Sequence, residues 1–369
     1  MTPSESTNAI AWKVLDPAEG NALVSPLGLY NVLKDLEAGT TPESPAGKAL
    51  REILGPAAPA PPYWEESTFR CSNLLVINSA SAGKVRQDYI DTLMKKLKHE
   101  CTVGDLTKDL DYVKGLVTRW VAEKTEGMIY SYQPSFREST SLAVFNALHL
   151  SCRWDIGGFL YDRAPFRTSS GKEYMVKMMH RNFMRIRFVD DGFYRAVFIP
   201  LRSDIGSETQ GGMAIIMPSD GSVSMAELWA KENPAYRSRF MSSLLDAPWF
   251  RAEVVFPAFT VRAETPLPEM LRRIGLYDAL CVEGMDAIGT DAKAYVSDGK
   301  QQCVLEADED GIEAAGVTEA DVVLGCAPNP VKVMEFVCGV PFVFAVCDRV
   351  SGTMIFAGKV DEPPEYREE

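Results

Sequence analysis

The sequence is poor in positive charge and in histidine. Its 51 aspartates and glutamates outnumber its 38 lysines and arginines, which gives a formal net charge of −13. A nucleic-acid-binding domain normally carries a basic surface, so we expect no nucleic-acid partner. The few histidines do not lie at zinc-site spacing, so we expect no metal ion, and we expect no cofactor either. These histidines are His99, His149 and His180.

Long hydrophobic runs and a secretory leader are also missing. No apolar run approaches the ~18 residues that would cross a membrane, so we expect no membrane partner. The first 25 residues lack the basic start, apolar core and small-residue cleavage site of a signal peptide. We therefore expect a protein that is cytoplasmic, or secreted without a recognisable signal peptide.

Paired cysteine motifs and hydrolase motifs are absent as well. The eight cysteines are scattered and none forms a CxxC pair, which predicts free thiols in a reducing compartment. The chain contains neither a GxSxG sequence nor a nucleophile–histidine pattern. We therefore expect no catalytic residue and no enzyme.

The composition that remains is that of a folded protein. Hydrophobic residues make up 46% and charged residues 24% of the 369, which is typical of globular chains. Length alone would suggest two domains. Residues 56–66 are rich in proline, so they should not form a helix. Strands are predicted from Phe69 to Ile77 and over 142–154 and 254–261, and helices over 8–20 and 111–129.

The most informative stretch runs from Val304 to Cys326. It begins as an apolar strand, becomes acidic, and is rich in small residues after Gly311. In an extended chain, the acids after Gly311 would all fall on one face, which leaves the other face free to enter a core. About 12 residues at ~3.3 Å each would give a strand of ~40 Å. The inward face would carry Ile312, Ala314, Gly316, Thr318, Ala320 and Val322.

This stretch resembles the reactive-loop hinge of the serpins, the serine protease inhibitors. In that family an exposed loop is cleaved by a protease and then inserts into the large sheet. The resemblance places the reactive loop at about 309–335. The hinge residues would be Glu309, Gly311, Ile312, Glu313, Ala314, Ala315, Gly316 and Thr318.

Further matches follow in order from about Asn21 to Pro363. The resemblance assigns a shutter that controls sheet opening and a breach where the loop enters. The chain has glycine at 28 where the family often has serine, and glutamine at 301 where it often has histidine. Glutamine can hydrogen bond but cannot become charged near neutral pH. The shutter and breach residues would be Ser25, Asn146, Trp154 and Gln301.

The resemblance implies an α+β fold. We expect a large central mixed sheet with two smaller sheets, about eight helices and an exposed reactive loop. It also implies one domain over residues 1–369, in place of the two suggested by length. Most serpins have a helix before Phe69 that commonly binds heparin, and we expect the proline-rich break to replace it here. We therefore expect a compact monomer that binds no heparin.

The implied function is protease inhibition as a suicide substrate. The protease would form an acyl-enzyme with the loop, and loop insertion would distort its active site before hydrolysis is complete. The alternative is a non-inhibitory carrier, chaperone or storage protein with the same fold. Ile312 favours the alternative, because inhibitory members usually have threonine or serine at this first inward position and isoleucine is bulky.

The reactive bond follows from the family's loop length. Counting from Gly311 places Gly325 before the bond, while shorter or longer loops would place Leu324 or Cys326 there. None of these is basic, which argues against a trypsin-like target. Leu324 would suit a chymotrypsin-like serine protease, and Gly325 an elastase-like or subtilisin-like one. A cysteine protease is a further target class.

Overall fold

The computed structural model describes residues 3–15, 20–55, 68–155, 157–202, 209–219, 243–312 and 333–367. The proline-rich run at 56–66 and residues 313–332 of the predicted reactive loop lie outside these ranges. Within them the chain forms six α-helices and three short 3₁₀ or π turns. The helices are α1 (Pro3–Val14), α2 (Pro26–Ala38), α3 (Pro45–Leu54), η1 (Ser79–Lys84), α4 (Gln87–Asp91), η2 (Thr92–Lys96), α5 (Leu110–Lys124), α8 (Leu267–Ile274) and η3 (Asp278–Glu283).

The strands of the described ranges form two sheets, one of 13 strands and one of three. Fewer sheets are seen than expected because the 18-residue β7 pairs with β6, β10 and β8 and joins their strands into one sheet. The strands are β1 (Ala22–Val24), β2 (Phe69–Asn78), β3 (Glu100–Gly104), β4 (Leu142–Leu150), β5 (Cys152–Trp154), β6 (Leu160–Arg167), β7 (Glu173–Asp190), β8 (Tyr194–Arg202), β9 (Thr209–Pro218), β10 (Trp249–Pro257), β11 (Phe259–Pro266), β12 (Lys300–Ala307), β13 (Gly311–Ile312), β14 (Met334–Val337), β15 (Phe342–Asp348) and β16 (Met354–Val360).

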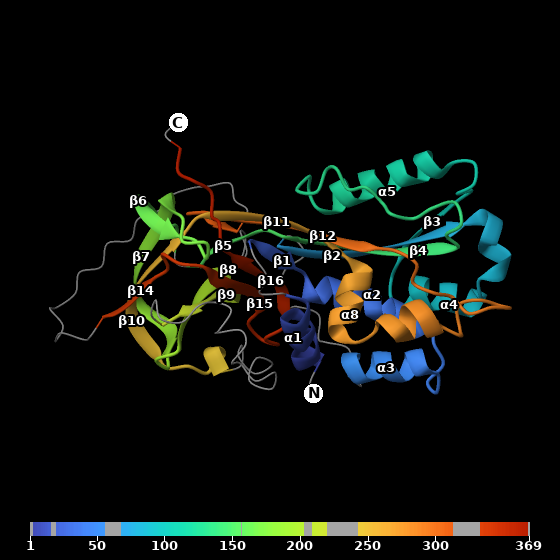
Figure 1. Cartoon of the computed structure of the whole chain (residues 1–369), viewed down its shortest axis with the longest axis horizontal. Helices are drawn as coiled ribbons and strands as arrows, with labels where there is room; N and C mark the ends of the chain where they lie inside the picture. Colours follow the sequence, from blue (N-terminus) through green and yellow to red (C-terminus); the bar gives the residue numbers. More distant parts are fainter. Residues whose placement is uncertain are drawn as a thin grey trace.

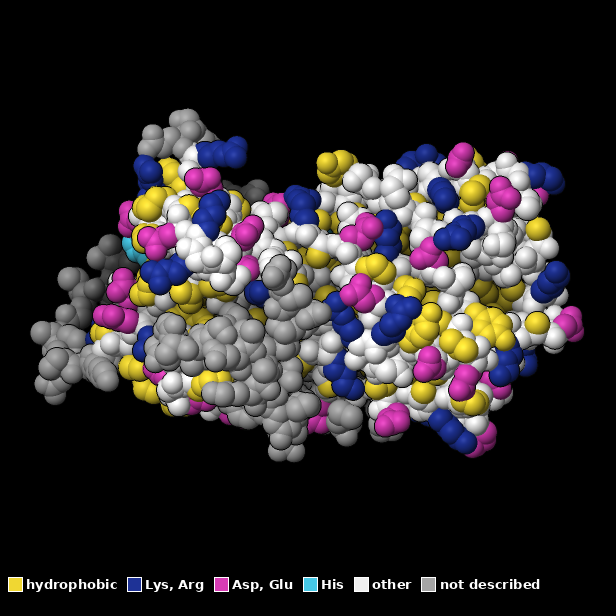
Figure 2. Space-filling model, viewed as in Figure 1, with side chains coloured by type: hydrophobic (Ala, Val, Ile, Leu, Met, Phe, Trp, Pro, Cys, Tyr) yellow, Lys and Arg dark blue, Asp and Glu magenta, His cyan; other side chains and the backbone are white. Residues whose placement is uncertain are grey.

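The predicted α+β fold is confirmed. A long layer containing β2, β4, β11 and β12 lies across the middle of the molecule (Figure 1). Helix α5 covers one side of this layer, and α1, α2, α3 and α8 lie on the other. Strands β6, β7, β10 and β14 gather at one end of the molecule, and β3 lies at the other end beside β2. On the face shown in Figure 2, cationic and anionic side chains are interspersed.

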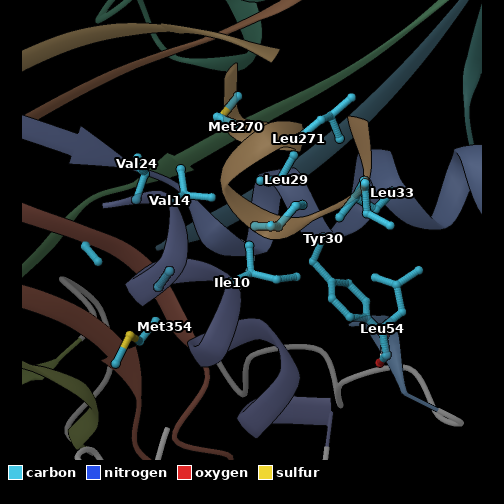
Figure 3. Close-up of a cluster of buried hydrophobic side chains, with 14 of the residues drawn as sticks. Ile10, Val14, Val24, Leu29, Tyr30, Leu33, Leu54, Met270, Leu271 and Met354 are labelled. Carbon is cyan, nitrogen blue, oxygen red and sulfur yellow. Dashed lines mark hydrogen bonds between the residues drawn. The ribbon is translucent and has the colours of Figure 1, made fainter. Parts of the chain in front are cut away.

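Helix α2 lies beneath this layer, and the residues at its N-terminus explain why the helix begins there. Ser25 has extended backbone angles and its Oγ accepts a hydrogen bond of 3.1 Å from the Gly28 amide, while proline follows in the first turn. One side of α2 is apolar and enters a core shared with α1, α3 and α8. Figure 3 shows Leu29, Tyr30 and Leu33 of α2 in this core, beside Ile10 and Leu271.

Several predicted elements are divided by the structure. The strand expected over 142–154 is broken at Ser151, because β4 pairs with β2 whereas β5 pairs with β8. The expected strand over 254–261 is likewise two strands, with Ala258 between them. The helix expected over 111–129 ends at Lys124, and that expected over 8–20 spans Pro3–Val14.

Asn8 of α1 ties the first helix to the turn between the last two strands. Its Nδ2 donates to the Gly352 carbonyl and its Oδ1 accepts from the Met354 amide, both at 2.9 Å, and the side chain is buried.

Asn8→Ala would leave both main-chain groups without partners, which should lower the free energy of unfolding by about 2–4 kcal/mol. We expect a lower urea midpoint for Asn8→Ala and an unchanged one for the exposed control Asn182→Ala. Equal midpoints for parent and Asn8→Ala would contradict this role.

Candidate functional site

A cleft of about 550 Å³ separates β4 from β12. All residues of β4 and most of β12 line it. Side chains of α2 lie on one side of it, and residues at the end of α5 and in the segment after α5 lie on the other. The opening therefore lies between two long strands, which carry Asn146 and Gln301, two of the predicted shutter residues.

The strands that border the cleft are not paired across it. Strand β4 is the edge of the three-stranded sheet and pairs with β2. Strand β12 pairs along its length with β11, and in the described part of the chain its other edge pairs only through Ala307 with Ile312. Within the described ranges, no strand pairs with the β4 edge that faces β12. Such edges present main-chain donors and acceptors that an added strand could satisfy.

After β12 the chain makes a tight turn at the end of the cleft beside β5, which we call the upper end. The Asp308 amide donates to the Gly311 carbonyl at 3.0 Å. The Asp308 carboxylate accepts from the amides of Asp310 and Gly311 at 3.0 and 3.2 Å. The turn reverses the chain, so that β13 runs antiparallel to both β12 and β5.

Gly311 and Ile312 are thus already seated between two strands. Gly311 pairs with Arg153 and Ile312 with Cys152. A Cβ atom on Gly311 would lie 2.3 Å from the Cys152 carbonyl oxygen, so the close approach requires glycine. The Ile312 side chain is only 3% exposed and joins the core between the sheets, on the inward face that the alternation predicted.

Trp154 supports this turn from the side. Its indole Nε1 donates to the Asp308 carbonyl at 2.8 Å, and the ring is fully buried. The Phe159 and Phe256 rings pack edge-on against it at 5.3 and 6.0 Å. The Phe159 amide in turn donates to the Glu309 carbonyl at 2.7 Å. Trp154 therefore holds the turn at Asp308, and Phe159 holds Glu309, the first of the predicted hinge residues.

Glu309 is also held by its side chain. Lys177 of β7 donates to both carboxylate oxygens at 2.7 and 2.6 Å, and its ammonium lies 4.2 Å from the centre of the Tyr161 ring. Partial burial acts to raise the pKa of Glu309, but the hydrogen bonds and charge of Lys177 and a main-chain hydrogen bond lower it below the ordinary value. Glu309 is therefore held as a carboxylate at neutral pH.

The predicted shutter residues are divided between the two sides of the cleft. On the β12 side, the Gln301 side chain forms two hydrogen bonds of 2.9 Å with the main chain of Ser25. Its Oε1 accepts from the Ser25 amide, and its Nε2 donates to the Ser25 carbonyl. The Ser25 hydroxyl donates to the Ile355 carbonyl at 2.8 Å. Gln301 thus fastens β12 to the start of α2.

On the β4 side, Asn146 is fastened to β2. Its Nδ2 donates to the side-chain oxygen of Asn73 at 2.7 Å and lies 3.3 Å from the Cys71 sulfur. Its Oδ1 is buried and has no hydrogen-bond partner among the residues that the structure describes. A Cβ on Gly28 would lie 3.1 Å from this oxygen, so glycine at 28 leaves the space beside it unfilled. Asn146 and Gln301 are not hydrogen-bonded to each other.

Sequence reasoning missed Lys177 and Asp308, which position the turn. Lys177 lies in the sequence run Val176–Met179, and Asp308 lies in the acidic stretch before Gly311. The remaining predicted site residues are outside the described ranges. These are Glu313, Ala314, Ala315, Gly316, Thr318, Leu324, Gly325 and Cys326.

Comparison with known proteins decides the family. The family described as serpin, serine protease inhibitor, matches residues 13–363. The chain belongs to the serpin family. A relative named serine protease inhibitor from Cyanea capillata is 24% identical over 379 residues, which cover 95% of this serpin and 94% of the relative.

Two solved structures show the same fold. The native state of tengpin, a thermophilic serpin, matches with a TM-score of 0.81 at 18% identity, over 98% of this chain and 93% of tengpin. Thyroxine-binding globulin in complex with thyroxine matches with a TM-score of 0.78 at 17% identity, over 98% of this chain and 99% of that protein.

Other features of this serpin were also searched within the described ranges. No helix there is long and apolar enough to cross a membrane, and no group of three His, Cys, Asp or Glu side chains could hold a metal ion. The seven cysteines there form no disulfide. Burial raises the pKa of Cys303, which lines the cleft, to about 12, so its thiol stays protonated. The eighth cysteine, Cys326, lies outside these ranges.

The close approach at Gly311 gives a direct test of the seated turn. In Gly311→Ala, the new methyl group would collide with the main chain of β5 and displace β13. We expect amide exchange at Ile312 to accelerate about tenfold, equivalent to losing one or two hydrogen bonds of ~1 kcal/mol each. Gly115→Ala on α5 is the control, because its Cβ would meet nothing closer than 3.9 Å. Unchanged protection at Ile312 would contradict the geometry.

The Lys177–Glu309 contact predicts a pH dependence. Because the folded pKa of Glu309 is lowered, the contact stabilises fully above the ordinary value of 4.5 and is lost as pH falls through the folded pKa. We expect acid titration of tryptophan fluorescence to show a transition below pH 4.5 that is absent in Glu309→Gln. A transition of equal size in both proteins would assign it to other carboxylates.

Proposed function

We propose that this serpin inhibits proteases as a suicide substrate. The observation that carries the proposal is the open cleft between β4 and β12, with Gly311 and Ile312 seated at its upper end. An inserting segment would continue from Ile312 down the cleft and pair with both strand edges. Insertion in this register needs no prior rupture of β4–β12 pairing in the described ranges.

The proposed reaction begins with attack of the protease nucleophile on the reactive-bond carbonyl. The acyl-enzyme that forms links the protease to the hinge side of the loop, and cleavage frees the other side. The freed hinge segment then inserts and carries the protease with it. Seven or more added backbone hydrogen bonds of ~1 kcal/mol each would be comparable to the whole stability of an ordinary domain, about 5–15 kcal/mol.

The environment of Ile312 supports inhibition despite its size. Its side chain is buried in the core between the sheets without displacing Trp154 from the turn. A bulky first inward residue is therefore accommodated before cleavage, and Ala314, Gly316 and Thr318 keep the next inward positions small in the sequence. The objection that Ile312 raises against inhibition is weakened accordingly.

The proposed targets are serine proteases that accept apolar or small residues. Leu324 before the bond would favour a chymotrypsin-like enzyme, Gly325 an elastase-like or subtilisin-like enzyme, and Cys326 remains the third position for the bond. A cysteine protease can form the equivalent thioester acyl-enzyme. We further propose that the protein acts as a monomer, without heparin.

A second candidate function is that of a small-molecule carrier. The cleft volume of about 550 Å³ falls in the range of roughly 300–1,000 Å³ common for small-molecule sites. The fold of thyroxine-binding globulin, crystallised with thyroxine, is similar. A carrier would bind its ligand reversibly and would not form a covalent complex with a protease.

The test uses two neighbouring alanines on opposite faces of the predicted hinge. Each purified protein is incubated with chymotrypsin, pancreatic elastase and subtilisin, and complexes that survive SDS are quantified. Ala314→Arg would place a charge inside the sheet and should be cut as a substrate, with at least a ~10-fold loss of complex. Ala315→Arg would point outward and should inhibit like the parent.

The outcomes separate the proposals. Covalent complexes in the parent and in Ala315→Arg, but not in Ala314→Arg, support insertion with the assigned inward face. Equal inhibition by both variants would overturn that face. Cleavage of the parent by all three proteases without any complex would overturn inhibition by these enzyme classes and favour the carrier.

A further inference from the structure

A cationic and aromatic surface lies on the outer face of β7 and β10, away from the cleft. These strands run side by side at the end of the molecule seen in Figure 1. We call it the Arg–Trp surface, and it does not take part in the proposed inhibitory mechanism. It is formed by Met184, Arg185, Arg187, Trp249 and Arg251.

The alternation of the strands places these side chains outward. On β7, Ile186 and Phe188 are buried on either side of Arg187. On β10, Ala252 and Val254 are buried, so Arg251 and Trp249 point to the opposite face. Trp249 remains 47% exposed, although burial of its large apolar ring would be energetically favourable.

Two guanidinium groups are held against the Trp249 ring. The Arg185 and Arg187 guanidinium carbons lie 4.5 and 4.4 Å from the ring centre. Arg187 is directly opposite Trp249 in the β7–β10 register, and its Nη1 donates to the Ala247 carbonyl at 2.5 Å. Cation–π contact restricts both side chains while leaving N–H groups for a ligand.

A β-bulge adds Met184 to the same face. The register passes from Phe250 opposite Ile186 to Ala252 opposite Phe183, so two residues of β7 stand against one of β10. Met184 and Arg185 are consecutive, yet both are exposed, and Met184 is 71% exposed. Bulges commonly re-aim a side chain in this way. The bulge therefore gathers an apolar group and cations on one face.

The three arginines of this surface lack close carboxylate partners in the described part of the chain, and Glu253, two residues along β10 from Arg251, shares its face without forming an ion pair with it. No ion pair joins Arg185, Arg187 or Arg251 to a carboxylate in the part of the chain that the structure describes, whereas the exposed Arg167 and Arg262 are paired with Glu173 and Glu306. The net charge of the whole chain is −13, so this cluster is opposite in sign to the molecule that carries it. An anionic partner would supply the missing charges.

We propose that the Arg–Trp surface docks an extended acidic segment of a partner protein. Arg185 and Arg187 are two residues apart on a strand, a separation of about 6.6 Å that matches alternate side chains of an extended peptide. Carboxylates at alternate positions would bind the guanidinium groups, and apolar side chains beside them would cover Met184 and Trp249. Arginine, tryptophan and methionine are also the residues enriched in protein interfaces.

A peptide fits the surface better than a nucleic acid. Nucleic-acid bases stack on open aromatic faces, whereas the Trp249 ring is contacted by two guanidinium groups. The surrounding protein is acidic and would repel a long polyanion through its net charge. A short segment with a few carboxylates meets the cationic cluster without meeting the rest of the acidic surface.

The test measures binding of a fluorescein-labelled peptide with repeated Glu-Leu-Glu units to the full-length protein by fluorescence anisotropy. The same peptide with glutamine for glutamate is the ligand control. Arg185→Glu/Arg187→Glu should weaken binding at least ~10-fold, and Trp249→Ala should weaken it about fivefold or more. Arg167→Glu/Arg262→Glu carries the same change in charge at a distance and should bind within about twofold of the parent.

Thermal denaturation checks that each variant folds. If Arg185→Glu/Arg187→Glu or Trp249→Ala does not fold, the milder pair Arg185→Gln/Arg187→Gln is tested in its place. It should still lose at least about fivefold in affinity. Absence of parent binding to the glutamate peptide, equal binding of the glutamine peptide, or equal losses in the distant control would each overturn the proposal. Tight binding of oligothymidylate or of a sulfated polysaccharide in preference to the peptide would also overturn it.

Discussion

The absence of pairing between β4 and β12 is the constraint on which the rest of the structure depends. An unpaired strand edge carries main-chain donors and acceptors that cost about 1–3 kcal/mol each when they are buried without partners. The structure leaves two such edges facing each other over a cleft of about 550 Å³. We infer that a native state with this feature is less stable than one in which a further strand fills the gap, and the sequence after Gly311 alternates as such a strand would.

The two walls of the cleft are held from behind. Gln301 fastens β12 to the start of α2, and Asn146 fastens β4 to β2. Neither side chain reaches across. At the upper end the opposite holds, because Trp154, Asp308 and the Lys177–Glu309 pair join the turn to β5 and β7. The cleft is therefore closed at one end by side-chain contacts and open along its length.

Much of this arrangement was predictable from sequence, because local rules determine it. Ser25 before Pro26 predicts a helix start, and the alternation after Gly311 predicts that Ile312 faces inward, where it is buried. The break at Ser151 was not predictable, since apolar residues continue on both sides and only tertiary pairing divides β4 from β5. The identity of Lys177 as the partner of Glu309 likewise depends on how β7 lies beside the turn, which is a long-range property.

The most direct test of the account is hydrogen exchange of β4 and β12 before and after a single cut in the reactive loop. If the hinge segment fills the cleft, amides on the facing edges of Leu142–Leu150 and Lys300–Ala307 should become strongly protected after cleavage. The pairing of β4 with β2 should remain as protected as before and serves as the internal reference. Unchanged exchange on both facing edges after complete cleavage would contradict loop insertion in this protein.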